Sequence, residues 1–345
     1  GKKGVQFNIT CTTGIKPKNV AQQGYAMMFV QGKYSDYTEE IAKGGFLNIN
    51  DIVTEDVLSE EYPEQIVDGK TIKYEDVEGK TIEDKIPEQY RFAMKGNDGN
   101  YYMLPHHEIL AGASYDVDLF EKYGFYLAQE PTEGARVTKF ESKLLGQTFY
   151  FTKVASNKTV GNDGVVGTDD DGMPTTLNEL VAMCEFMKSK RVWPFSVAGG
   201  HLDYNNYVVE ALWAALAGYD QRMAVVSHEG TVDYVTGVGT EELWAGTGIM
   251  KPVIEKSTLI GDSTDGYKAV NQAARYYSFA FQELAYKQGW YYDRYKENNY
   301  NHKEAMRSFI FNGEDDIPEI ASHVEGSYWY NEAESYGFIH DYEAL

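Results

Sequence analysis

The sequence predicts an α/β protein with mostly parallel sheets. Short apolar runs alternate with helical patterns along much of the 345 residues, and helices placed between strands in this way usually connect parallel strands. The chain is 43% hydrophobic, enough for a sizeable core, so its formal charge of -22 does not predict disorder. The same charge argues against nucleic acid or an anionic membrane as partner, because both attract basic surfaces.

The first part of the chain carries few regular patterns. Residues 4–13 alternate like a strand, residues 25–30 form an apolar run, and residues 34–43 are typical of a helix that ends at Gly44. Residues 48–90 hold 13 acidic residues against four lysines, a local charge of -9, and we expect a surface insertion there. Its tandem repeat, Val-Asp-Gly-Lys-Thr-Ile and then Val-Glu-Gly-Lys-Thr-Ile, predicts a hairpin built around the two Gly turns.

Clearer signals follow. Residues 91–94 and 101–104 flank Asn97-Asp-Gly-Asn, which is typical of a hairpin. Ser114 begins a strand that passes into a helix ended by Gly124, and Thr176 with Glu179 forms a capping box. A polar loop is expected over 155–174, a strand over 192–197, and helices over 117–123, 177–190, 204–216, 267–287 and 302–311.

The two cysteines are too few for a disulfide framework or a zinc signature. Cys184 lies in a helical pattern, and we expect it to be a small buried side chain. The given sequence has no charged leader and no run of 18 apolar residues, so we expect a soluble chain. Its 28 tyrosines exceed its 16 phenylalanines, and tyrosine suits clefts that bind polar ligands, although most of the 28 are expected at the surface.

Motifs of the common enzyme classes are missing. Gly69 and Gly79 each precede Lys-Thr, but a phosphate-binding loop needs a glycine five positions earlier, where Glu64 and Tyr74 stand. A dinucleotide fingerprint from Gly237 fails at its third glycine, and no Gly-x-Ser-x-Gly or His-Glu-x-x-His occurs. We therefore predict a protein that is not an enzyme.

The best metal candidate is a Gly-rich acidic loop, whose carboxylates could wrap a calcium ion. Its spacing does not match an EF-hand, because Glu179 falls one position short. We favour a solvated acidic loop, with calcium binding as the alternative. The candidate ligands are Asn162, Asp163, Asp169, Asp170 and Asp171.

An ordered series of motifs is more specific than any of these patterns. It runs through Tyr101-Tyr-Met-Leu-Pro105, Ser114-Tyr-Asp-Val-Asp-Leu-Phe120, Pro174-Thr-Thr-Leu-Asn-Glu-Leu180, Trp193-Pro-Phe195 and Gly326-Ser-Tyr328-Trp329. The series resembles the extracellular solute-binding proteins of carbohydrate ABC importers, the family that includes maltose-binding proteins. The resemblance covers residues 20–335, with Asp116-Val117 in place of the Asn-Lys common in the family.

The resemblance implies a periplasmic-binding-protein-like architecture of two lobes, each a mostly parallel sheet flanked by helices. We expect the first lobe over 1–109, the second over 110–330, and a segment returning to the first lobe over 331–345. Members of the family usually begin with a further strand and helix and continue well past the Gly-x-aromatic segment. We therefore expect the first lobe to be incomplete in this chain.

The implied function is non-catalytic binding of a mono- or oligosaccharide in an interlobe cleft, without a cofactor. The protein would be an extracellular, lipid-anchored monomer that delivers its sugar to the membrane permease subunits of an importer. The positions carried over from matching motifs as ligand-binding residues are Gln31, Lys33, Tyr34, His107, Glu108, His201, Asp203, Tyr204, Tyr328 and Trp329.

Two other functions stay open. One is an enzyme acting on carbohydrate through a carboxylate pair of the cleft, such as Glu108 and Asp203. The other is a surface sensor or adhesin that reuses the binding fold. The positions also have structural interpretations: Asp203 could cap a helix, His107 could be a structural histidine, and Tyr328 with Trp329 could belong to a core.

Overall fold

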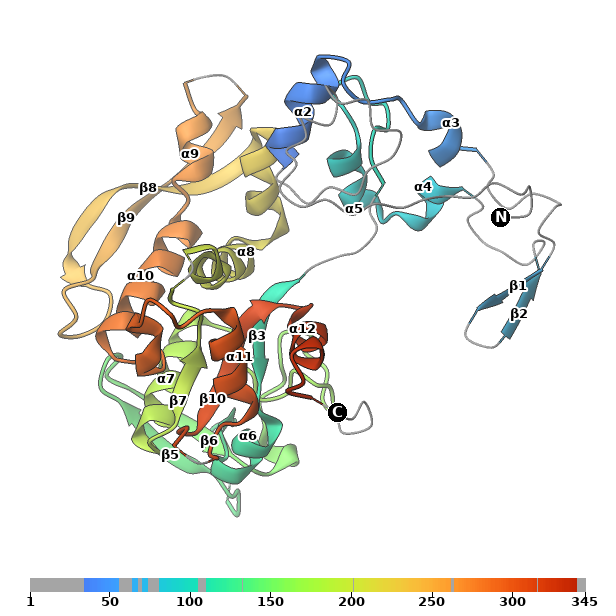
Figure 1. Cartoon of the computed structure of the whole chain (residues 1–345). Helices are drawn as coiled ribbons and strands as arrows, with labels where there is room; N and C mark the ends of the chain where they lie inside the picture. The colour runs from blue at the N-terminus through green and yellow to red at the C-terminus, as the bar shows by residue number, and fades with distance from the viewer. Residues whose placement is uncertain are drawn as a thin grey trace. The chain divides into compact units, whose positions relative to one another are not determined.

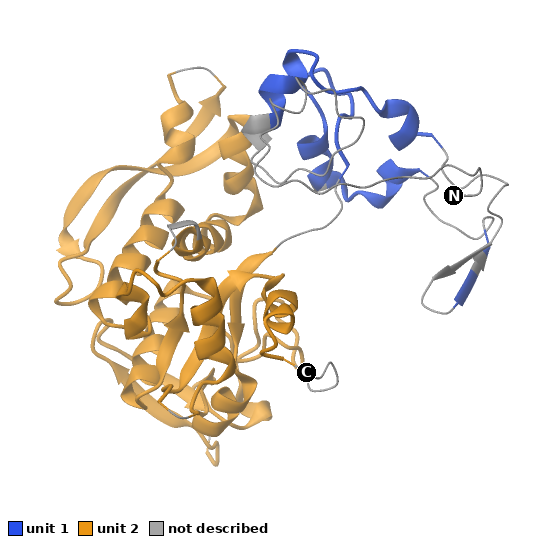
Figure 2. Ribbon diagram, in the orientation of Figure 1, with its two compact units in different colours: residues 1–108 blue, residues 109–345 orange. Residues whose placement is uncertain are grey.

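The computed structural model describes residues 34–55, 64–67, 70–73, 81–104, 110–131, 133–200, 202–261, 264–314 and 316–339. These residues form both helices and strands, which confirms the mixed α/β class (Figure 1). The chain divides into two compact units, residues 1–108 and 109–345 (Figure 2). The strand predicted over 4–13 and the apolar run over 25–30 lie outside the described residues.

The first unit contains short elements. They are α2 Tyr34–Ala42, α3 Asn50–Val53, β1 Glu64–Val67, β2 Lys70–Lys73, α4 Ile82–Lys85, α5 Glu88–Arg91 and the 3-10 turn Phe92–Met94. Helix α2 ends where the sequence predicts, because Gly44 takes a φ of +75° and its N–H bonds to the carbonyl of Ile41 at 2.9 Å. Strands β1 and β2 pair antiparallel with Val67 opposite Lys70, so the predicted hairpin forms at the first copy of the repeat only and not around both Gly turns.

The second copy of the repeat folds differently. Thr81 caps α4 by accepting the N–H of Asp84, and the Asp84 carboxylate accepts the N–H of Thr81. The residue that corresponds to Asp84 after the first copy is Tyr74, which has no carboxylate and cannot make this reciprocal pair. The same Thr-Ile pair therefore lies in a strand in one copy and at a helix start in the other.

The hairpin predicted around Asn97 is only half right. The turn forms, because Gly96 donates to the carbonyl of Asn100 at 2.9 Å and Lys95 bridges Tyr101. Neither arm is a strand, however, since residues 88–94 form α5 and a 3-10 turn and Tyr101 makes only an isolated bridge. Pro87 stands just before α5, where its fixed φ suits a helix start, and this local preference wins over the alternation pattern.

The second unit holds the larger elements. Its helices are α6 Val117–Tyr123, α7 Leu177–Ser189, α8 Leu202–Ser227, α9 Gly266–Val270, α10 Ala273–Lys287, α11 His302–Ile310 and α12 Trp329–Ser335. Its strands are β3 Ala111–Tyr115, β4 Tyr126–Leu127, β5 Thr138–Ser142, β6 Gln147–Thr152, β7 Trp193–Ser196, β8 Glu229–Glu242, β9 Met250–Ile260 and β10 Ile320–Gly326. Within the described part of the chain, no helix is long and apolar enough to cross a membrane.

The prediction of mostly parallel sheets is wrong for the described residues. The three-stranded sheet β3-β10-β7 contains one parallel pair, β10 with β7, while β3 pairs antiparallel with β10. The sheet β4-β6-β5 and the ladder β8-β9 are antiparallel. Short connections explain the error, because β5 and β6 are joined by a tight turn at Gly146 (φ +62°) rather than by a helix.

Local signals fixed most helix boundaries. The capping box at Thr176 and Glu179 opens α7, and Gly124, with a φ of +69°, ends α6, both as predicted. Helix α8 is interrupted at Gly218, close to the predicted end at residue 216, and then continues to Ser227. The predicted helix over 267–287 is two helices, α9 and α10, with a break at residues 271–272.

Helices pack on both faces of β10, the central strand of its sheet. Val324 joins a core cluster with Val208 of α8 and Cys184 of α7, while the next side chain back, His323, stacks on Phe309 of α11. Successive side chains of a strand point to opposite faces, so the strand separates two packed layers. Cys184 is 1% exposed, which confirms its predicted burial.

Candidate functional site

The carboxyl ends of β7 and β10 lie at one edge of their sheet, because these two strands are parallel. Beyond that edge β7 leads through Gly199-Gly200 into α8, and β10 leads into α12. In α/β sheets, ligands bind outside the carboxyl ends of parallel strands. Two segments that the sequence predicts as ligand-binding, 201–204 and 328–329, follow this edge.

Only part of the predicted ligand-binding set lies in the described structure. The side chains of Tyr204, Tyr328 and Trp329 are described, and all belong to the second unit. Tyr34 begins α2 in the other unit, and Asp203 lies in the first turn of α8. The remaining predicted residues lie outside the described residues: Gln31, Lys33, His107, Glu108 and His201.

Two of the predicted residues meet in one hydrogen-bonded group, which we call the tyrosine cluster: Tyr204, Tyr207, Tyr328 and Glu325. The Tyr328 hydroxyl donates to Oε1 of Glu325 at 3.1 Å and lies 3.2 Å from the Tyr207 hydroxyl. The rings of Tyr204 and Tyr207 contact edge to face at 5.5 Å. All three tyrosines are half-buried, so the cluster combines accessible ring surface with hydroxyl groups.

A histidine extends the cluster toward α11 and α12. The imidazole of His302 stacks on the Tyr204 ring, with centroids 5.5 Å apart and planes 7° from parallel. Its Nε2 lies 3.2 Å from the Tyr336 hydroxyl. Side chains of α8, α11, α12 and β10 thus converge at the carboxyl edge of the β7–β10 pair.

Glu325 of the tyrosine cluster also belongs to a buried polar pair. His323 and Glu325 alternate on β10 and are 0% and 3% exposed, with His323 Nε2 3.5 Å from Glu325 Oε2. Neither of these two atoms, nor His323 Nδ1, has a hydrogen-bond partner among the described residues. Buried polar groups are usually paired, so unpaired ones commonly mark a site where a function offsets their cost.

The electrostatics keep the tyrosine hydroxyls protonated. Burial, helped by the nearby charge of Glu325, raises the pKa of Tyr204 to about 12. Burial also raises the pKa of Tyr328, with further contributions from Tyr207 and Glu325. Both residues are therefore neutral at physiological pH and can act as hydrogen-bond donors and acceptors.

Trp329 does not join the hydroxyl network. Its indole N–H donates to the Ser114 hydroxyl of β3 at 2.9 Å, and its ring packs edge-on against His323 and Phe309. These contacts anchor α12 to the sheet. Because Tyr328 directly precedes Trp329, the same contacts help to hold Tyr328 in place.

The carboxylates of the acidic loop serve the loop's own turns. Asp170 accepts the backbone N–H of Asp163 and the hydroxyl of Thr168, and Asp171 accepts the N–H of Gly167 at 2.7 Å. Among the described residues, no group of three or more His, Cys, Asp or Glu side chains is placed to hold a metal ion. Calcium binding by Asn162, Asp163, Asp169, Asp170 and Asp171 stays a prediction.

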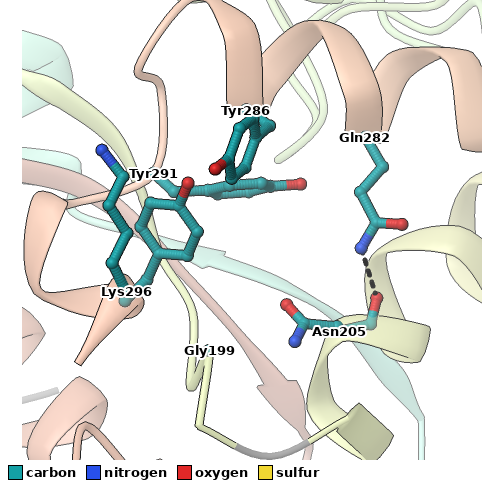
Figure 3. Close-up of a pocket in the computed structure, with 7 residues that line it drawn as sticks. Gly199, Asn205, Gln282, Tyr286, Tyr291 and Lys296 are labelled. Carbon is teal, nitrogen blue, oxygen red and sulfur yellow. Dashed lines mark hydrogen bonds between the residues drawn. The ribbon is translucent and has the colours of Figure 1, made fainter. Parts of the chain in front are cut away.

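A pocket of about 400 Å³ lies near the start of α8. It is lined by Gly199, Asn205 and residues of α10 and the segment that follows it. Figure 3 shows Gln282 of α10 facing Asn205 of α8, with a hydrogen bond of 3.2 Å from the Gln282 amide to the Asn205 carbonyl. Three tyrosine rings form the opposite wall: Tyr286, Tyr291 and Tyr295. The pocket lies wholly within the second unit.

Comparison of the chain with models of known protein families, with curated proteins and with solved structures found no match. The family resemblance therefore rests on the sequence motifs alone.

Several residues of this region are absent from the set predicted from the sequence. Tyr207 carried a usable signal, because it lies three positions after Tyr204 and so on the same helix face. His323 and Glu325 are polar residues within an otherwise buried strand, which indicates a special role once the strand is known. His302 and the pocket tyrosines had no local signal that distinguishes them from surface residues.

Proposed function

We propose that this protein binds a sugar without catalysis and that the sugar contacts the tyrosine cluster. One observation carries the proposal: Tyr204 and Tyr328, predicted from two motifs more than 120 residues apart, share the network of Tyr207 and Glu325. A sugar presents hydroxyls in fixed directions and an apolar C–H face. Tyrosine rings with neutral hydroxyls and a carboxylate acceptor suit both features.

The position of the cluster also supports the proposal. It lies at the carboxyl ends of two parallel strands, the usual place for small-ligand sites in α/β sheets. Next to it on β10, His323 Nε2 and Glu325 Oε2 face each other at 3.5 Å, buried and without a hydrogen bond among the described residues. Such groups cost folding free energy, so their retention favours a functional role over a packing role.

The cellular role follows from the sequence motifs. We propose a two-lobe binding protein that closes over its sugar by a hinge motion. It would act outside the cell, attached to the membrane by a lipid, and deliver sugar to the permease subunits of an ABC importer.

Isothermal titration calorimetry of the chain against single sugars tests the binding. The probes are glucose, galactose, mannose, xylose, maltotriose and cellotriose, each with product analysis for cleavage. We expect at least one to bind reversibly and to be recovered intact. Tyr328→Phe should weaken binding about tenfold, because it removes one hydroxyl that can hydrogen-bond to the sugar.

The matched control is Tyr219→Phe, which removes the same atom from a tyrosine that is 61% exposed on α8. It should bind like the parent chain. Failure of every probe to bind would refute the proposal, and cleavage of a probe would replace it with the enzyme alternative. Equal affinity of Tyr328→Phe and the parent chain would remove the tyrosine cluster as the site.

A further inference from the structure

The pocket beside α8 has the features of a second binding site. Its volume of about 400 Å³ falls near the lower end of the roughly 300–1,000 Å³ typical of small-molecule sites. It uses none of the tyrosine-cluster side chains, although Asn205 directly follows Tyr204 in α8. Its lining comes from β7's loop, α8, α10 and the residues after α10, so several elements fix its shape.

A buried hydroxyl points into this pocket. Tyr291 is 3% exposed, and its hydroxyl has no hydrogen-bond partner within the described part of the chain. Figure 3 shows the hydroxyl directed toward the side on which Gln282 and Asn205 lie. An unsatisfied buried hydroxyl destabilises the folded protein, and a polar ligand in the pocket would supply the missing partner.

The tyrosine rings provide an apolar wall opposite the two amides. Tyr295 contacts Tyr286 edge to face at 5.8 Å and Tyr291 at 5.4 Å. The three rings therefore hold one another at fixed angles. Tyr286 is 60% exposed, so part of its surface is accessible to a ligand.

Close backbone packing keeps the wall in position. A side chain at Gly199 would place its Cβ 2.0 Å from the carbonyl oxygen of Tyr295, a distance that no structure tolerates. The absence of a side chain at Gly199 lets the Tyr295 segment approach the loop after β7. The pocket is thus formed by the fold itself rather than by loosely placed surface side chains.

The charges around the pocket favour a neutral ligand. None of the described residues that line it is acidic, which disfavours a cation. The one charged lining group, the Lys296 ammonium, pairs with Asp293 at 3.3 Å and lies away from the amides in Figure 3. Burial raises the pKa of Tyr291 and brings that of Tyr295 to about 12, so both hydroxyls stay neutral.

From these contacts we infer that the pocket binds one neutral sugar ring. The ring's C–H face would pack on the tyrosine wall, and its hydroxyls, which donate and accept like amides and phenols, would face Tyr291, Gln282 and Asn205. This site shares the ligand class of the proposed function but none of its residues, so either site could exist without the other.

The test compares Tyr291→Phe with the parent chain, using glucose, galactose, mannose and xylose as probes in calorimetry and saturation-transfer NMR. We expect one of these sugars to bind and Tyr291→Phe to weaken it about tenfold. The variant's melting temperature should stay equal or rise, because it removes a buried hydroxyl that has no partner among the described residues. Weaker binding with undiminished stability is a combination that a merely structural tyrosine would not produce.

Controls separate this site from the tyrosine cluster. Tyr219→Phe should leave binding unchanged, and Gln282→Ala should weaken the same sugar as Tyr291→Phe. If Tyr328→Phe weakens binding while Tyr291→Phe and Gln282→Ala do not, the pocket inference is overturned and the proposed function stands. If none of the four sugars binds the parent chain, the pocket inference is overturned. If maltotriose and cellotriose fail as well, the proposed function falls with it.

Discussion

Replacement of Asp116 tests how strongly one side chain joins two helices of the second unit. Its Oδ1 accepts the N–H of Leu119 at 2.9 Å and caps α6, and its Oδ2 accepts the amide of Asn312, after α11, at 2.9 Å. An N-cap contributes about 1 kcal/mol, and a partly buried hydrogen bond contributes about 1 kcal/mol more. Asp116→Ala should therefore lower the free energy of unfolding by about 2 kcal/mol.

A second variant separates the two contributions. Serine is as good an N-cap as aspartate, but its hydroxyl is too short to reach Asn312. Asp116→Ser should therefore cost about 1 kcal/mol. For a unit of this size about 1 kcal/mol corresponds to about 2–4 °C, so the melting temperature should fall by about 2–4 °C for serine and about 4–8 °C for alanine.

Urea unfolding followed by tryptophan fluorescence is the suitable assay. All five tryptophans lie in the second unit, so the signal in the intact chain follows that unit alone: Trp193, Trp213, Trp244, Trp290 and Trp329. The reasoning fails if serine costs as much as alanine, because the cap, which serine keeps and alanine loses, would then contribute nothing. A loss below about 0.5 kcal/mol for alanine would refute both contributions.

Three further predictions concern single groups of the second unit. Burial raises the pKa of Glu332, so Glu332→Gln should stabilise the protein at pH 7, where the buried carboxylate is charged. This gain in the free energy of unfolding, measured in urea, should vanish as the pH falls through 4.5. A gain that stays constant with pH would contradict the prediction. Burial raises the pKa of the Cys184 thiol, so in a Cys11→Ser background iodoacetamide at pH 8 should react with Cys184 only at the rate of unfolding. Rapid labelling of Cys184 in the native protein would contradict this prediction. Gly124→Ala should lower the free energy of unfolding by about 1–2 kcal/mol, because a φ of +69° is combined with a Cβ 2.8 Å from Lys153. Gly146→Ala has a φ of +62° but open space around the Cβ, so it should lower the free energy of unfolding less in the same melt. Equal losses would show that the Lys153 contact does not contribute.

Local chemistry made parts of the fold predictable from the sequence. The box at Thr176 and Glu179 and the glycine at 124 act within one helical turn, so the sequence alone indicates where α7 begins and α6 ends. Strand pairing depends on residues far apart in the chain. The sequence offered no means to predict that β10 pairs antiparallel with β3 and parallel with β7.

The ladder β8–β9 shows why whole strands were missed. Gly237 lies within β8 at a register shift between Val235 and Gly237, and glycines at such irregularities interrupt the alternation that reveals a strand. In the sequence, this glycine stands out only as the first residue of an incomplete nucleotide-binding motif. In the structure it lies beside a register shift of the ladder, opposite Val253.

The candidate site was predictable in part. Tyr204 and Tyr328 follow from the family resemblance, and the structure brings them into one cluster. The neighbours that complete the cluster are Tyr207 of α8 and Glu325 of β10, and the position of Glu325 depends on the sheet topology. Tyr291 could not be predicted from the sequence for the same reason, because its place in the pocket depends on how the segment after α10 packs.

A crystal structure of the chain grown with the sugar that binds most tightly in calorimetry tests the central claim most directly. The account expects intact sugar in contact with the ring of Tyr204 or the hydroxyl of Tyr328. Density for a cleaved product would contradict non-catalytic binding. A sugar bound away from the tyrosine cluster would contradict the proposed site. A sugar found only in the pocket at Tyr291 would make that pocket the sugar-binding site in place of the tyrosine cluster.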